Sequence, residues 1–279
     1  MTSKQSAIQS GFRASTSAAQ VLEGRDLSNV TAIVTGGHSE LRLETTRALA
    51  SAGVRIIVAA RDPEAARIEV AGIESIETDR LDLADLASVR DFAGRFLATG
   101  RHLDILIGSA GIMACPETRM GSDWEAQFAT DHLGHYLLVN LLWPALKGGA
   151  RVIAVSSAGH HHSGIRWDDV QFMRGYDKWL AYGQSKTANA LFAVHLDRLS
   201  QNEDVRAFPP SWQDFQPAPA SSNAWRNDYC RLARRQWKSR RSDFQNDAAG
   251  SGDPGMDRNV SAVRRYWVVC TARIARLLK

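Results

Sequence analysis

Short apolar runs alternate with longer stretches of helical spacing from residue 26 to residue 208. The short runs are apolar on both faces, which is typical of parallel strands that helices cover on either side. The longer stretches repeat their apolar residues every three or four positions, as amphipathic helices do. We predict strands at 31–35, 54–60, 73–81, 103–111, 151–157 and 205–208, and helices that end at Ala50 or span 62–70, 84–100, 124–146 and 181–199.

This alternation predicts consecutive βαβ units, and therefore an α/β protein with a Rossmann-type doubly wound parallel sheet between two helical layers. Crossovers of this kind are right-handed, so ligands are expected at the carboxyl ends of the strands. Asp62 is expected to cap its helix, with Pro63 in the first turn. The alternation stops after Phe208, so we expect the sheet to be incomplete at its C-terminal edge. The predicted parts are a flexible N-terminal segment at 1–25, a sheet domain at 26–208 and an aberrant, poorly ordered tail at 209–279.

Composition places limits on the class of protein. Hydrophobic residues make up 44% of the 279 residues, enough for one sizeable domain. No apolar run approaches the roughly 20 residues of a membrane span, and the first residues lack the apolar core of a secretory signal. Cys115, Cys230 and Cys270 are far apart and form neither a zinc pattern nor a disulfide framework. We therefore expect a reducing, cytoplasmic location.

The tail differs in charge from the rest of the chain. Residues 209–279 contain 13 Lys and Arg against 6 Asp and no Glu, whereas residues 1–208 contain 21 basic and 24 acidic residues. Four of the eight tryptophans also lie in the tail. A disordered basic segment is the simpler interpretation. An arm that binds nucleic acid through Arg and Trp is a less favoured one.

The segment "YGQSK" carries the first chemical signal, because Tyr182 and Lys186 lie four residues apart and share a helix face. A tyrosine is normally a poor base near neutral pH, but a nearby ammonium favours the phenolate form. Such a pair can exchange a proton with an alcohol or a carbonyl. Ser156 and Ser157 end a predicted strand about 25 residues earlier, which leaves room for a substrate loop. Alone, a Tyr-x-x-x-Lys pair is most often ordinary helix surface.

Six segments, one of which extends "YGQSK", supply the context: "LETTRALA", "DLADLASVRDF", "GIMACP", "DHLGHYLL", "VSSAGH" and "YGQSKTANALFA". As a set, they resemble the short-chain dehydrogenase/reductase family, and most closely its retinol-dehydrogenase-like and WW-domain-oxidoreductase-like branch. The resemblance covers about residues 11–208. It implies an NAD(P)-binding Rossmann domain at 26–208 and hydride transfer between the nicotinamide and an alcohol or carbonyl substrate.

The resemblance also implies a role for each matching residue. Tyr182 resembles the general acid/base, Lys186 the residue that assists it and holds the nicotinamide ribose, and Ser157 the hydroxyl that steadies the substrate oxygen. Asp131 stands where the family has a catalytic Asn. The expected cofactor-binding residues are Thr35, Gly36, Gly37, Ser39, Glu40, Leu41, Arg61, Asp82, Leu83, Ala110, Gly111, Tyr182 and Lys186.

Three residues depart from the family pattern. Glu40 and Arg42 replace the last two glycines of a T-G-x-x-x-G-x-G loop, in which the glycines let the backbone approach the pyrophosphate. Glu40 would repel a phosphate, whereas Arg42 would attract one while filling the space that close packing needs. An ionised Asp131 cannot donate the hydrogen bond that an Asn donates. These changes predict a degenerate phosphate loop and an altered proton relay.

Arg61 follows the second predicted strand, where a cation meets the 2′-phosphate of NADP. We therefore favour NADP over NAD, although the adjacent Asp62 leaves the choice open. The three histidines of "GHHHSG" (159–164) are expected in the substrate loop. Consecutive loop residues rarely converge on one ion, so no metal site is predicted.

The codons behind the tail offer a third interpretation of it. Codons for "PSWQDF" read one base later can encode "HPGRI", and "LARRQWKSRRSDFQNDAAGSG" can shift to "WLDGNGNPADPIFKTTQQGAA". From Trp267 onward, the other shifted frame gives "GGVYCEDCQVA". All three shifted segments resemble the C-terminal region of the family. We therefore predict a frameshift near residue 209 and a second frame change near Arg265, and resequencing of the gene tests this hypothesis.

The sequence thus favours an NAD(P)-dependent oxidoreductase that acts on a small alcohol or carbonyl, with Tyr182 moving the proton. One alternative is a catalytically impaired remnant of such an enzyme. A nucleic-acid-binding module with a basic tail is less favoured. A homo-oligomer is compatible with the resemblance, since the family's helix interfaces fall within the matched region.

Overall fold

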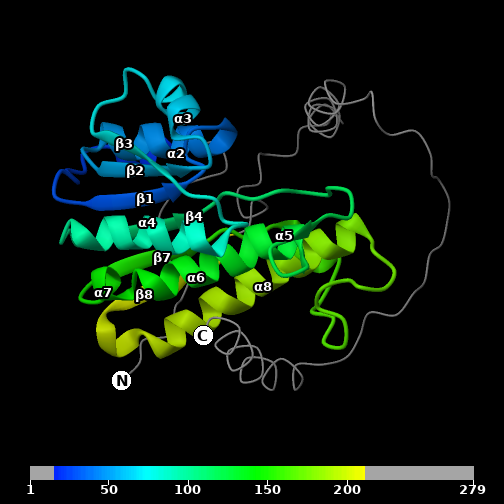
Figure 1. Ribbon diagram of the computed structural model, residues 1–279. Helices are drawn as coiled ribbons and strands as arrows, with labels where there is room; N and C mark the ends of the chain where they lie inside the picture. The colour runs from blue at the N-terminus through cyan, green and yellow to red at the C-terminus, as the bar shows by residue number, and fades with distance from the viewer. Residues whose placement is uncertain (1–15, 211–279) are drawn as a thin grey trace. The chain divides into compact units, whose positions relative to one another are not determined.

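The structure, a computed structural model, describes residues 16–210, except for the side chains of Glu40 and Leu41 (Figure 1). These residues belong to the first of two compact units, Met1–Gln216. The second unit, Pro217–Lys279, lies outside the described residues, as do residues 1–15. The predictions for the tail beyond residue 210, including the frameshift, therefore stay predictions.

A six-stranded parallel sheet forms the centre of the described part, with the strand order β3-β2-β1-β4-β7-β8. This confirms the predicted doubly wound sheet. The order reverses between β1 and β4, and ligands bind at such a reversal, outside the carboxyl ends of the strands. The strands are β1 (Thr31–Thr35), β2 (Arg55–Ala60), β3 (Ile76–Arg80), β4 (Ile105–Gly108), β7 (Ala150–Ala154) and β8 (Val205–Phe208).

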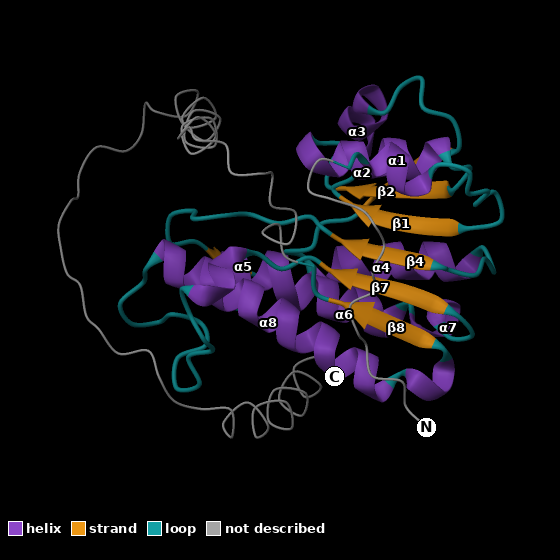
Figure 2. Cartoon of the chain, turned by 180° about the vertical axis from the view of Figure 1, so that it is seen from behind, coloured by secondary structure: helices purple, strands orange, loops and turns teal. Residues whose placement is uncertain are grey.

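Helices lie on both faces of the sheet, so the three-layer prediction is also confirmed. Figures 1 and 2 show α4, α6 and α8 on one face, and α2 and α3 on the other. Asp62 caps α3 as expected, and its Oδ1 accepts hydrogen bonds from the backbone N–H groups of Glu64 and Ala65, at 3.1 and 3.0 Å. The main helices are α2 (Glu40–Ser51), α3 (Pro63–Glu69), α4 (Leu86–Ala98), α6 (Gly134–Leu141) and α8 (Lys178–Leu199).

The single helix predicted at 124–146 is wrong. A short hairpin of β5 (Arg119–Met120) and β6 (Trp124–Glu125) comes first, and Glu125 then caps α5 (Ala126–Phe128). A π-helical turn (Ala129–Leu133) joins α5 to α6, and a separate helix, α7 (Trp143–Leu146), follows. Pro144 has no N–H to donate, which explains why α6 ends before it.

A short helix, α1 (Ala18–Leu22), lies within the segment 1–25 that was expected to be flexible. The helix forms because Ser17 and Gln20 make a capping box. The backbone N–H of Gln20 donates to Ser17 Oγ at 3.2 Å, and that of Ser17 donates to Gln20 Oε1 at 2.8 Å. α1 also lies against α2.

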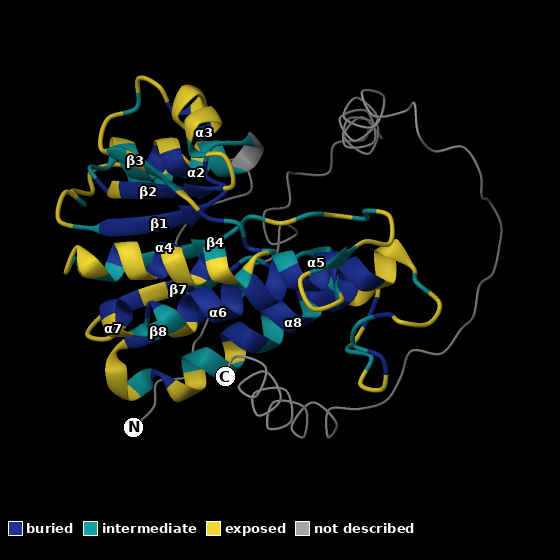
Figure 3. Cartoon of the chain, in the orientation of Figure 1, coloured by how far each residue is buried: buried dark blue, intermediate teal, exposed yellow. Residues whose placement is uncertain are grey.

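The two faces of the sheet differ in burial near β8. Leu106, Val152 and Ala207 share one face through the strand register and are almost fully buried. On the opposite face, Ile107, Ile153 and Phe208 share a register row but are only partly buried (Figure 3). The predicted incompleteness beyond β8 falls on residues outside the described part. Within that part, no helix is both long and apolar enough to cross a membrane.

Candidate active site

Four predicted catalytic residues come together beyond the carboxyl ends of β4 and β7. Ser157 follows β7 and begins a short 3₁₀ helix, η2 (Ala158–His161), while Asp131 lies in the π-helical turn. Tyr182 and Lys186 lie in the N-terminal half of α8, which starts at a side-chain cap from Asp177. The carboxylate of Asp177 accepts two backbone N–H groups at 2.8 Å each, so the start of α8 is firmly placed.

Tyr182 and Lys186 face each other from consecutive turns, with Lys186 Nζ 5.4 Å from the centre of the tyrosine ring. Both residues are buried. A methyl group added to Gly159 would lie 2.6 Å from Tyr182 Cε1 and 3.5 Å from Ser157 Oγ, so the ring and the hydroxyl flank the same point. Ser156 Oγ also donates to the backbone carbonyl of Lys186 at 2.9 Å. The structure therefore brings the serine, the tyrosine and the lysine into one site.

Asp131 forms an ion pair with Lys186, with 3.1 Å between Oδ2 and Nζ. The backbone N–H of Ile112 donates to the other carboxylate oxygen at 2.8 Å, and Ser185 Oγ lies 3.1 Å from Oδ2. The Asp131 side chain is 0% exposed. Burial raises the pKa of Asp131, because the charged form loses its hydration, and the Lys186 ammonium opposes this rise.

Two buried histidines follow Asp131. Burial lowers the pKa of both His132 and His135 to about 4, so both are neutral near pH 7. The carbonyl of Asp131 can only accept, so His135 Nδ1 donates to it at 2.9 Å. Nε2 of the neutral ring then accepts from Thr35 Oγ1, also at 2.9 Å. His135 therefore links the π-helical turn to the end of β1.

The expected cofactor residues at the ends of β1 and β4 are hydrogen-bonded to each other. Thr35 Oγ1 accepts the backbone N–H groups of Ser109 and Ala110 at 3.0 and 2.9 Å. Gly36 has a φ of +66°, and a methyl group there would lie 3.2 Å from Ala110 Cβ. A methyl group on Gly37 would lie 2.6 Å from Thr46 Oγ1. Both positions therefore need glycine, as a phosphate loop does.

Arg42, at a position where the resemblance implies a loop glycine, crosses from α2 to the end of β4. Its Nη2 donates to Ser39 Oγ at 3.0 Å, and its Nη1 lies 3.5 Å from the carbonyl oxygen of Ser109. Ser39 is the N-cap residue of α2. The guanidinium group thus lies across the point where the sheet order reverses, beside the N-terminus of α2.

The other expected cofactor residues follow β2, β3 and β4. Arg61 is exposed directly after β2, and it makes no ion pair with another described residue. Asp82 follows β3, where its carboxylate accepts the backbone N–H of Ala84 at 3.0 Å. Leu83 is buried against Gly134. Gly111 lies beside Asp131 and Lys186, since a methyl group there would approach them to 2.9 and 3.3 Å.

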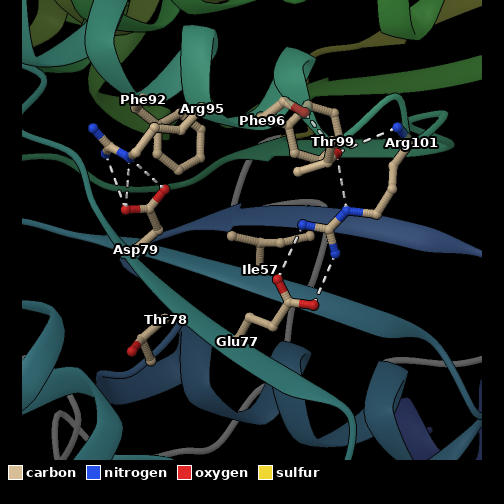
Figure 4. Close-up of a pocket in the computed structure, with 9 residues that line it drawn as sticks. All are labelled: Ile57, Glu77, Thr78, Asp79, Phe92, Arg95, Phe96, Thr99 and Arg101. Atoms are coloured by element: carbon tan, nitrogen blue, oxygen red, sulfur yellow. Dashed lines mark hydrogen bonds and ion pairs between the residues drawn. The ribbon is translucent and has the colours of Figure 1, made fainter.

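A pocket of about 180 Å³ lies elsewhere, between β3 and α4 (Figure 4). Two ion pairs line it, Arg95 with Asp79 at 2.9 Å and Arg101 with Glu77 at 2.8 Å. None of the predicted catalytic or cofactor residues lines this pocket. It is therefore a separate surface feature.

The sequence analysis missed two residues that build the site, Ser185 and Asn189. Asn189 Oδ1 accepts from His132 Nδ1 at 3.1 Å, and its amide donates to the carbonyl oxygens of Asp131 and Val155. Asn189 lies seven residues after Tyr182, on the same face of α8, and this helical spacing is a signal that could have identified it. No cluster of His, Cys, Asp and Glu able to hold a metal ion occurs among residues 16–210.

A parallel sheet with a strand-end serine and a Tyr-x-x-x-Lys helix defines a class of dinucleotide-dependent oxidoreductases. Residues 30–208 match a family model described as short chain dehydrogenase. The chain therefore belongs to the short-chain dehydrogenase/reductase family, in its retinol-dehydrogenase-like branch. This confirms the family inferred from the sequence motifs.

Curated relatives agree with this assignment. The chain is 38% identical over 213 residues to "Short-chain dehydrogenase TIC 32 B, chloroplastic" of Brassica napus, covering 71% of this chain and 67% of the relative. It is 34% identical over 262 residues to "Retinol dehydrogenase 12" of Mus musculus, covering 86% and 80%. The match to "Probable oxidoreductase" of Streptomyces lividans, 44% identical, covers 61% of this chain and only 59% of the relative.

Solved structures share the fold. A protein from Mycobacterium paratuberculosis is 36% identical, with a TM-score of 0.64 over 74% of each chain. A metagenomic short-chain oxidoreductase in complex with NADP is 26% identical, with a TM-score of 0.54 over 66% of this chain and 82% of that one.

Proposed function

We propose that this chain is an NAD(P)-dependent oxidoreductase that interconverts a small alcohol and its carbonyl compound. The observation that carries the proposal is the convergence of Ser157, Tyr182 and Lys186 in one buried site beyond β7. Family membership supports the reaction type.

Each residue has a part that follows from its chemistry. Tyr182 Oη takes the hydroxyl proton from an alcohol, or returns one to a carbonyl oxygen. Ser157 Oγ accepts the Gly159 N–H at 3.1 Å, so its own proton is free to hold the substrate oxygen. Lys186 supplies the charge that favours a phenolate. When bound, the nicotinamide supplies the hydride chemistry, and the protein supplies orientation and electrostatics.

The residues present fit such a cofactor at most positions. Gly36 and Gly37 leave the backbone without side chains in front of α2. A side chain at Gly37 would collide with Thr46, and one at Gly36 would be strained by the φ of +66°. The N-terminus of α2 favours an anion. Gly111 brings the loop after β4 close to Lys186, where a nicotinamide ribose would be held. Arg42 is the point where the fit is altered.

The exposed Arg61 supports NADP as the preferred cofactor. Asp62, which left the choice open, uses Oδ1 to cap α3, so it is already engaged at the helix. We expect Arg61→Ser to weaken NADPH binding about tenfold and to leave NADH binding unchanged, since one charge-assisted hydrogen bond is lost. Fluorescence titration of both cofactors measures this.

Arg55→Ser is the matched control, because Arg55 is also exposed on β2 but lies at its opposite end. It should leave both dissociation constants unchanged. An equal loss of NADH and NADPH affinity in Arg61→Ser would remove Arg61 from the choice of cofactor. An unmodified chain without saturable binding of either cofactor at millimolar concentration would overturn the proposed function.

Arg42 gives a specific reason to keep the impaired remnant as a second candidate. Its guanidinium is held between Ser39 and Ser109, across the place expected for the pyrophosphate. We expect Arg42→Gly, alone or with Glu40→Gly, to tighten NADPH binding about tenfold, which corresponds to about 1.4 kcal/mol. The same fluorescence titration measures the gain.

Arg47→Gly controls for the helix-weakening effect of glycine, since Arg47 is exposed on α2 and paired with Glu44. Cofactor affinity should not change in this variant. Weaker NADPH binding in Arg42→Gly would mean that Arg42 holds the phosphate rather than obstructing it.

A further inference from the structure

We propose that Asp131 is a positioning residue that holds the Lys186 ammonium and offsets its charge beside Tyr182. This inference deepens the proposed function, because it rests on Tyr182 acting as the general acid/base. It concerns a position where the resemblance drawn from the sequence motifs implies an uncharged Asn.

The contacts of Asp131 show a carboxylate built into the site. Lys186 Nζ lies 3.1 Å from Oδ2, while the backbone N–H of Ile112 donates to Oδ1. Ser185 Oγ lies beside Oδ2, and a methyl group on Gly111 would come within 2.9 Å of Oδ1. The side chains of Asp131 and Lys186 are 0% and 8% exposed. Water therefore screens this ion pair poorly, so each charge acts strongly on neighbouring groups.

Among residues 16–210, the other groups that face this pair do not supply a compensating charge. His132 follows Asp131 in the π-helical turn, and His135 lies one turn later in α6. Their lowered pKa of about 4 leaves both histidines neutral. From the β4 side comes Cys115, and burial raises the pKa of its thiol, which stays protonated. Glu125 faces Asp131 from β6, and burial raises its pKa as well. Glu125 is itself an acid, so it cannot replace the positive charge of Lys186 that Asp131 offsets.

The η2 helix also contributes a titratable group near the Tyr182 ring. His160 lies next to Gly159, which packs against Tyr182. His160 Nδ1 lies 2.5 Å from the carbonyl oxygen of Ser157, and its ring stacks on His161 at 3.9 Å between centroids. Both of these contacts of the His160 ring are with residues of its own segment, Ser157 and His161. Within the described part of the chain, Lys186 is therefore the cation beside Tyr182, and Asp131 is the group that offsets its charge.

An amide in place of the Asp131 carboxylate would keep the shape of the side chain and remove its charge. The amide oxygen would still accept the Ile112 N–H, and Lys186 would keep its full positive charge. A cation at about 4–6 Å favours the ionised form of a neighbouring acid by about 1 to 3 pH units. Asp131→Asn should therefore shift phenolate formation at Tyr182 to lower pH.

The test follows phenolate absorbance of the whole chain against pH, without substrate or added cofactor. The chain has five tyrosines, so each spectrum is corrected with the same protein carrying Tyr182→Phe. We expect the midpoint of the Tyr182 signal to fall by about one pH unit in Asp131→Asn. The acid limb of the pH–rate profile for alcohol oxidation should move by the same amount.

Asp79→Asn is the matched control, because Asp79 also pairs with a basic residue, Arg95, but lies in the separate pocket beside α4. It should leave the midpoint unchanged. Asp131→Ser, smaller and also uncharged, gives a second reading if the amide variant folds poorly. If the midpoint of the Tyr182 signal stays the same or rises in whichever of the two Asp131 variants folds, the proposal is overturned. A lowered midpoint without turnover in either protein would instead overturn the proposed function and leave the ion-pair inference intact.

Discussion

Tyr182→Phe is expected to reduce turnover by about a hundredfold to ten-thousandfold, which is the range that a general acid/base contributes. The substitution removes one hydroxyl and keeps the ring that packs beside Gly159 and Lys186. The fold should therefore be retained, and the cofactor affinity should fall far less than turnover. Steady-state rates with a panel of small alcohols and carbonyls, together with NADPH titration of the same samples, measure both quantities.

Tyr136→Phe is the control for this substitution. Tyr136 lies on α6, where its ring packs edge-on against Phe192 at 5.4 Å between centroids. The change removes the same hydroxyl from a buried tyrosine that lies outside the Ser157–Lys186 site. Turnover should be close to that of the unmodified chain. Unchanged turnover in Tyr182→Phe would show that another group moves the proton.

Local signals in the sequence were sufficient for most of the fold. Asp62 followed by Pro63 predicted the start of α3, because a capping carboxylate and a proline in the first turn act within a few residues. The strands were recognisable because β1 and β2 are apolar on both faces and buried. These features need no knowledge of distant residues.

The region from Trp124 to Leu146 shows where such reasoning fails. Apolar residues there occur on every side of the helix, so periodicity does not reveal a change of helical type. The π-helical turn depends on tertiary contacts, since the carbonyl of Asp131 accepts from Asn189 on α8. Those partners lie 58 residues apart in the chain.

The candidate site, like the fold, could be predicted only in part from the sequence. The motif spacing placed Tyr182, Lys186 and Ser157 in one site, and the structure brings them together, while their roles stay predictions. The partner of Asp131 could not be inferred, because an ion pair depends on where the π-helical turn presents its side chain. The path of Arg42 to Ser109, 67 residues away, is likewise a property of the fold.

Gly134→Ala is expected to lower the free energy of unfolding by about 3 kcal/mol, because an added methyl group has nowhere to go. It would overlap the carbonyl oxygen of Leu83 and lie 2.8 Å from Leu83 Cβ. Leu83 is buried, and its backbone cannot move aside as a flexible side chain can. Gly134 is also the first residue of α6, directly after the turn that holds Asp131. Urea unfolding followed by circular dichroism measures the loss.

Gly94→Ala is the control, because the same substitution at this position should raise the free energy of unfolding rather than lower it. Gly94 is exposed within α4, and a methyl group there would meet no atom within 4 Å. Alanine should therefore stabilise the protein by about 0.5 to 1 kcal/mol through helix propensity alone. A stabilised Gly134→Ala variant would contradict the close approach of α6 to the loop after β3. Since that approach positions both Leu83 and the turn bearing Asp131, the pair of variants tests how the fold places the site.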